Sequence, residues 1–211
     1  MKVRVMVVDD HTIIREGVAM LLGQTFDLEV VGTAATGAEA VRSVRILRPD
    51  VVVTDISMPE LNGIEATRAI RERDPHIAVV VLSMHSNREH VARAFAAGAA
   101  GYVLKDAAGA EIVAAVRCVA TGRRYLSQGL EALPEPGHLD SSAPLASLST
   151  RERQVLQMVV EGRSSAEIAR QVHLSPKTVE TYRSRLMKKL GVSDIPALVK
   201  FALQHGVTTL D

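Results

Sequence analysis

The chain has 211 residues, of which 47% are hydrophobic, enough for two domains that each bury an apolar core. Its single cysteine excludes an internal disulfide framework, and no apolar stretch approaches the roughly 20 residues that span a bilayer. The N-terminus lacks a signal-peptide layout, so we expect a soluble, cytoplasmic protein with no membrane partner. Residues 1–147 carry a net charge of −3 and residues 148–211 one of +4, a division that fits a regulatory domain joined to a nucleic-acid binder.

Short aliphatic runs alternate with amphipathic stretches through residues 1–125. Runs rich in valine and isoleucine predict five strands, at Val3–Val8, Glu29–Ala34, Val51–Thr54, Ile77–Leu82 and Gly101–Leu104. Helical periodicity between them predicts helices near 12–23, 37–47, 62–73, 87–97 and 108–121. This alternation is typical of an α/β domain with a doubly wound, five-stranded parallel sheet, whose functional groups collect at the carboxyl ends of the strands.

The pattern changes after residue 125. Residues 126–147 are rich in proline, glycine and small polar residues without periodicity, which predicts an interdomain linker. Residues 148–211 predict an all-α domain with helices near 150–161, 165–172, 176–190 and 194–205. Capping boxes that begin at Ser149 and Ser164, and Ser175 before Pro176, mark three of the helix starts. The short turn between the second and third helices suits a helix-turn-helix.

Acidic side chains stand where strands of the predicted sheet end. Asp9 and Asp10 close the first strand and Asp55 closes the third, and these strand ends are neighbours in a doubly wound sheet. Such a cluster is costly unless a cation neutralises it, and ligands that are all oxygen favour Mg²⁺. Ser83 ends the fourth strand and Lys105 follows the fifth, where a hydroxyl and an ammonium can hold phosphoryl oxygens.

In type, order and spacing these five residues resemble the receiver domain of response regulators. The run from Asp55 to Gly63 is also similar to the phosphorylation-site loop of that family. The resemblance implies that Asp55 accepts a phosphoryl group from a cognate sensor histidine kinase. It further implies a Mg²⁺ site and a pair of switch residues. The metal ligands would be Asp9, Asp10, Asp55 and a backbone carbonyl near Ser57. The residues of the phosphoryl contact and switch would be Ser83, Tyr102 and Lys105.

The helix after Ser175 separates into two faces at about 100° per residue. Its apolar stripe is expected to face the core and consists of Val179, Tyr182, Leu186 and Leu190. The opposite face is polar and partly basic and consists of Lys177, Glu180, Thr181, Ser184 and Lys188. A face of this kind suits a recognition helix in the major groove of double-stranded DNA, and it also suits a merely solvated surface.

Several runs favour the first of these interpretations because they resemble the LuxR-type helix-turn-helix: residues 148–152, 161–162, 167–169, 174–179 and 189–192. With the receiver, they make the whole chain similar to the NarL/FixJ class of response regulators. The resemblance implies DNA contacts from Lys177, Thr178, Glu180, Thr181, Arg183, Ser184, Arg185 and Lys188. Many relatives carry lysine at the position of Glu180 and histidine at that of Tyr182. Glu180 therefore either accepts from a cytosine amino group or lowers non-specific affinity, and the base preference stays open.

The last predicted helix is apolar over much of its circumference. This face suggests either a dimer contact of the kind that the family uses or a surface that the linker or the receiver covers. By the resemblance, we expect a homodimer that forms on phosphorylation or DNA binding. The prediction is a DNA-binding transcription regulator controlled by phosphorylation, not an enzyme. Two alternatives are a DNA-binding protein that is independent of phosphorylation and a Mg²⁺-dependent phosphatase. Against the phosphatase, the sequence contains no phosphate-cradling G-x-x-x-x-G-K-[ST] loop.

Overall fold

The computed structural model describes residues 2–86, 88–130, 144–205 and 207. The chain divides into two compact units, Met1–Leu139 and Asp140–Asp211, each with its own hydrophobic core. The predicted linker, residues 126–147, lies partly outside the described residues, because its residues 131–143 are not among them. No helix in the described ranges is long and apolar enough to cross a membrane.

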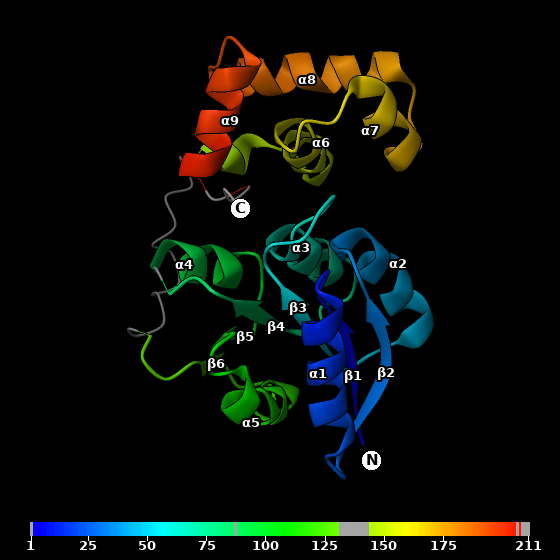
Figure 1. The fold of residues 1–211 in the computed structure, drawn as a ribbon, viewed down its shortest axis with the longest axis vertical. Coiled ribbons are helices and arrows are strands. Elements are labelled where there is room, and N and C mark those ends of the chain that lie inside the picture. The colour runs from blue at the N-terminus through cyan, green and yellow to red at the C-terminus, as the bar shows by residue number, and fades with distance from the viewer. Residues whose placement is uncertain (1, 87, 131–143, 206, 208–211) are drawn as a thin grey trace. The chain divides into compact units, whose positions relative to one another are not determined.

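The first unit is an α/β domain with a parallel sheet in the order β2-β1-β3-β4-β5-β6 (Figure 1). The strands are β1 (Val3–Val8), β2 (Leu28–Ala34), β3 (Val51–Asp55), β4 (Ala78–Ser83), β5 (Gly101–Leu104) and β6 (Tyr125–Leu126). All five expected strands are present, and the predicted fold class is confirmed. A sixth strand, β6, which has two residues and pairs with β5, was not predicted from the sequence.

Helices cover both faces of this sheet (Figure 1). Alternate strand residues point into two cores, with Val5 and Val7 in one, Met6 and Val8 in the other. The first core is closed by α1 (Thr12–Gly23) and α5 (Ala108–Ala120). The second is closed by α2 (Gly37–Leu47), α3 (Gly63–Arg73) and α4 (Arg88–Ala96). Burial on both faces explains why these strands are apolar almost without interruption.

Residues just after β6 are held firmly against the first unit. The backbone N–H of Ser127 donates to the carbonyl of Tyr102 in β5 at 2.9 Å, and the Ser127 side chain is buried. Glu111 of α5 accepts hydrogen bonds from the hydroxyls of Ser127 and Tyr125, at 2.5 and 3.2 Å, and from the backbone N–H of Gln128. The chain therefore continues to follow the sheet for some residues beyond position 125.

The second unit is helical, as expected. A 3₁₀ turn, η1 (Pro144–Ser147), precedes α6 (Thr150–Val160), α7 (Ser165–Val172), α8 (Pro176–Leu190) and α9 (Ile195–Gln204). Both capping boxes form, because Glu152 and Glu167 each accept from the backbone of the serine that caps the same helix. Glu152 also accepts from Lys189 at 2.7 Å and so joins the start of α6 to the end of α8.

Candidate phosphorylation and DNA-binding sites

The carboxyl ends of β1 and β3 bring together the acidic residues that the sequence analysis selected. Ligand atoms of Asp9, Asp10, His11 and Asp55 all lie within 4.8 Å of one another. Asp9 and Asp55 are only 1% and 2% exposed. Together with Lys105, the lysine that faces them, Asp9, Asp10 and Asp55 form the acidic pocket.

Lys105 follows β5 and supplies a cation at the centre of this pocket. Its Nζ lies 2.9 Å from an oxygen of Asp9 and 2.9 Å from an oxygen of Asp55. Burial raises the pKa of Asp55 above its usual range, although the charge and hydrogen bond of Lys105 oppose that rise. Burial alone lowers the pKa of Lys105, but the two carboxylates outweigh it and the pKa is raised. Lys105 is therefore a fixed positive charge.

The carboxylate oxygens of the pocket have few partners. Oδ2 of Asp9 and Oδ2 of Asp55 both face the single ammonium of Lys105, at 2.9 Å, and Oδ1 of Asp10 faces Nδ1 of His11 at 3.0 Å. Two buried carboxylates that share one cation keep a net negative charge, and a hard divalent cation offsets it. The residues present therefore fit Mg²⁺. His11 was not assigned from the sequence, yet its Nδ1 lies 3.0 Å from Asp10 and 3.4 Å from Asp9, with the side chain 65% exposed.

A glycine at the start of α3 allows the loop after Asp55 to fold closely against the strand. A Cβ on Gly63 would lie 1.8 Å from the backbone oxygen of Asp55, a distance that no side chain can occupy. The N–H of Gly63 donates to the carbonyl of Ile56 at 2.9 Å and closes the loop. Ser57 lies in this loop with an exposed side chain, and its backbone forms a hydrogen bond with Asp55.

Ser83 and Tyr102, the predicted switch pair, are both buried and both contact His85. Ser83 ends β4, and its Oγ accepts from the N–H of His85 at 2.9 Å. The Tyr102 hydroxyl donates to the carbonyl of His85 at 2.7 Å. The Tyr102 ring is fully buried, and this burial raises the pKa of its hydroxyl to about 12. The ring thus points inward in this structure, and its hydroxyl is a neutral donor.

Helix α8 presents the polar face that the sequence analysis expected. Val179 and Leu186 are buried, and Tyr182 and Leu190 pack against the same core. The outward face of α8 consists of five exposed polar residues, Lys177, Glu180, Thr181, Ser184 and Lys188. Arg185 is also exposed, Thr178 is half-buried, and the Arg183 side chain is only 25% exposed.

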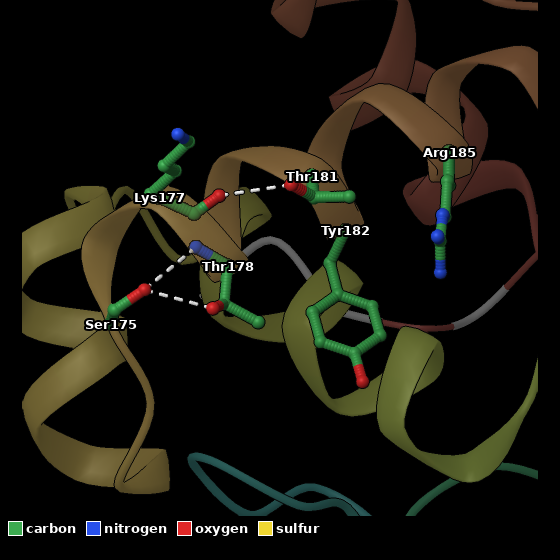
Figure 2. A pocket seen from close by; sticks show the side chains of 6 residues that line it. All are labelled: Ser175, Lys177, Thr178, Thr181, Tyr182 and Arg185. Carbon is green, nitrogen blue, oxygen red and sulfur yellow. Dashed lines mark hydrogen bonds between the residues drawn. The ribbon is translucent and has the colours of Figure 1, made fainter.

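A hollow of about 330 Å³ lies at the start of α8 (Figure 2). It is lined by Ser175, Lys177, Thr178, Thr181, Tyr182 and Arg185. The Ser175 side chain caps the helix by accepting from the N–H of Thr178 at 3.1 Å. Hydroxyls, free cations and a positive helix end in one place suit the oxygens of a DNA phosphate.

The two units match two family models. The receiver domain of response regulators matches residues 5–117, and the bacterial regulatory proteins of the luxR family match residues 146–202. The transcriptional regulatory protein MctR of Rhizobium johnstonii is 40% identical over 99% of this chain and 96% of its own length. The response regulator UvrY of Escherichia coli K12 is 38% identical over 97% of this chain and 95% of its own.

A solved structure of two RcsB dimers bound to two parallel DNAs is also similar. It is 27% identical, covers 97% of this chain and 99% of its own, and has a TM-score of 0.57. The chain thus belongs to the NarL/FixJ family of response regulators, which join a receiver to a LuxR-type helix-turn-helix. It is a DNA-binding response regulator of a two-component system.

Proposed function

We propose that Asp55 is the phosphoacceptor and that its phosphorylation by a sensor histidine kinase controls DNA binding through α8. The observation that carries this proposal is the acidic pocket, in which a buried Asp55 faces Lys105 and lies beside Asp9 and Asp10. A buried carboxylate beside a fixed cation, with further carboxylates that can hold Mg²⁺, is suited to accept a phosphoryl group, because the lysine and the metal would offset its negative charge.

In the proposed reaction, an Asp55 carboxylate oxygen attacks the phosphorus of a phosphohistidine, and the bond to the imidazole nitrogen breaks. Lys105 then pairs with a phosphoryl oxygen in place of one carboxylate contact, and the hydroxyl of Ser83 donates to another. Asp9, Asp10, Asp55 and the backbone carbonyl of Ser57 would hold Mg²⁺. When bound, this ion would neutralise charge on the phosphoryl oxygens during transfer.

The DNA-binding part of the proposal concerns residues 148–211, with residues 1–125 as the receiver and 126–147 as the linker. The outward face of α8 would meet DNA, and half-buried Thr178 would contribute its hydroxyl. The phosphates would be contacted by Lys177, Arg183, Arg185 and Lys188. The base edges would be faced by Glu180, Thr181 and Ser184. We extend to this chain the dimers that RcsB forms on DNA, so that two copies occupy two half-sites.

Intact-mass measurement after treatment with acetyl phosphate and Mg²⁺ tests the first part. We expect the wild type and the control Asp74→Asn, an exposed carboxylate at the end of α3, to gain one phosphoryl group. Asp55→Asn should gain none. The proposal fails if the wild type stays unlabelled under conditions that label another receiver, or if Asp55→Asn is labelled equally.

DNA affinity, measured with and without acetyl phosphate treatment, tests whether phosphorylation regulates DNA binding. We expect DNA affinity to change with phosphorylation in the wild type and in Asp74→Asn but not in Asp55→Asn. Equal affinity of the labelled and unlabelled wild type would favour regulation independent of phosphorylation. In a separate assay with small phosphate esters, turnover beyond one phosphoryl group per chain would favour a phosphatase.

A further inference from the structure

Three side chains of α7 and α8 form a closed network beside the outward face of α8. Ser165, the first residue of α7, donates its hydroxyl to Oε1 of Glu180 and accepts from Nη1 of Arg183 at 2.8 Å. The same Nη1 lies 3.4 Å from Oε1 of Glu180. One hydroxyl thus links an acid and a base that lie about one turn apart on the recognition helix.

Arg183 differs in this respect from the other cations of the helix. Lys177, Arg185 and Lys188 are exposed and form no ion pair within the described part of the chain. Lys189 pairs with Glu152 and belongs to the internal structure of the unit. Arg183 therefore differs from these cations because an acidic residue of the same helix, Glu180, restrains its guanidinium.

Glu180 is well placed to act on Arg183. It is the single acidic residue of α8, which carries five basic ones, and its side chain is 60% exposed. An exposed ion pair is weak by itself, but the Ser165 hydroxyl fixes its geometry by bonding both partners. Oε1 of Glu180 already has two protein partners, so this oxygen takes part in the network in the free protein.

We infer that Glu180 sets DNA specificity indirectly, by holding Arg183 against Ser165 in the free protein. In the free protein this restraint prevents Arg183 from binding phosphates of arbitrary DNA, as Lys177, Arg185 and Lys188 do. Arg183 leaves Glu180 and binds a phosphate only on a DNA sequence that allows α8 to dock closely in the groove. Glu180 is thus a positioning residue, and the inference rests on the proposed DNA-binding role of α8.

The test is a double-mutant cycle on the acetyl-phosphate-treated full chain. The probes are a duplex of arbitrary sequence and a duplex selected by this protein from a random pool, each over a range of salt concentrations. In Glu180→Gln, we expect affinity for the arbitrary duplex to rise roughly threefold to tenfold, and the salt slope to steepen by about 0.9, the value for one added phosphate contact. Affinity for the selected duplex should rise less, so the specificity ratio falls.

Two further variants identify the mechanism. In an Arg183→Gln background, Glu180→Gln should leave the salt slope almost unchanged, because no restrained cation remains to be released. Ser165→Ala should shift the slope in the same direction as Glu180→Gln, by less. Asp194→Asn removes the same charge from the cap of α9, where asparagine caps equally well, and should leave the specificity ratio unchanged.

Three results would overturn the inference. One is a change in salt slope that is equal when Glu180→Gln is made in the wild type and in the Arg183→Gln background. Another is an equal effect of Asp194→Asn, which would reduce the role of Glu180 to its net charge. The third is a loss of discrimination in Glu180→Gln at a single base pair of the selected duplex, which would mean direct base contact. A wild type that binds neither duplex would instead refute the DNA-binding role of α8.

Discussion

The acidic pocket and the outward face of α8 are both charged, but they differ in burial. Asp9, Asp55 and Lys105 lie at strand ends and are almost inaccessible to solvent. Lys177 and Lys188 project from a helix into solvent. A buried charge depends on a few fixed partners, so loss of one partner is costly, whereas exposed charges act weakly and nearly independently. Substitutions in the first region should therefore change stability and chemistry, and those in the second mainly DNA affinity and its salt dependence.

The largest expected difference is between two lysines. Lys105→Met leaves two buried carboxylates without their cation and should lower the free energy of unfolding of the first unit by about 3 kcal/mol. Lys188→Met on α8 should change stability by less than about 0.5 kcal/mol. Urea unfolding in the presence of a chelator, followed by circular dichroism, measures both. Equal decreases in the free energy of unfolding for the two variants would contradict the contrast between buried and exposed charge.

A comparison of two glycines tests the loop that supports Asp55. Gly63→Ala should destabilise the first unit by about 2–3 kcal/mol, because the backbone at Asp55 must move away from the new Cβ. Gly109→Ala, in a part of α5 with open space around the glycine, should stabilise the same unit by about 0.5–1 kcal/mol. Hydrogen exchange of the amides in β1 and β3 measures the change in stability of the first unit in each variant. If Gly63→Ala is neutral, the close approach to Asp55 is not required.

The titration of Asp55 in the metal-free protein reports on the environment of this side chain. Burial raises the pKa of Asp55, so its proton is retained to a higher pH than on an ordinary aspartate. The carboxyl carbon of Asp55, followed by NMR in the presence of a chelator, should therefore titrate with a midpoint above 3.8, the usual value. Lys105→Met should move this midpoint upward, because Lys105 lowers the pKa of Asp55. A midpoint at or below the usual value, or a downward shift, would contradict this description.

The smallest effect is expected on the outward face of α8. Lys188→Ala should weaken binding to selected and arbitrary duplexes by the same factor and reduce the salt slope by about 0.9. The matched control is Lys200→Ala, an exposed lysine of α9, which should leave the slope unchanged. Fluorescence anisotropy at several salt concentrations measures both variants. A preferential loss on the selected duplex would show that Lys188 contributes to sequence recognition.

Local patterns explain what the sequence predicted well. The strands of the first sheet are long, apolar runs, and the helices of the second unit begin at explicit caps, so both were located closely from the sequence. The clustering of the acidic residues was predicted from the sequence because the carboxyl ends of parallel strands lie at one edge of a sheet. The clustering follows from that topology, and it needs no knowledge of side-chain packing.

Features that depend on the approach of distant segments were not predicted. A two-residue strand such as β6 has no periodicity to detect, and its pairing depends on where α5 returns the chain. The contact of Ser165 with Glu180 and Arg183 depends on how α7 crosses α8, which the pattern of either helix does not encode. The need for glycine at position 63 was noted only by resemblance, and its cause is an approach of two backbones.

The attachment of residues 125–130 to the first unit has a consequence for protein engineering. Ser127 is bonded to Tyr102 and Glu111, and Leu130 packs against the core of the sheet. A chimera that joins this receiver to another output domain must therefore keep the native chain through residue 130. A fusion point at residue 125 would remove half of an edge strand and leave the Glu111 carboxylate without two of its three donors.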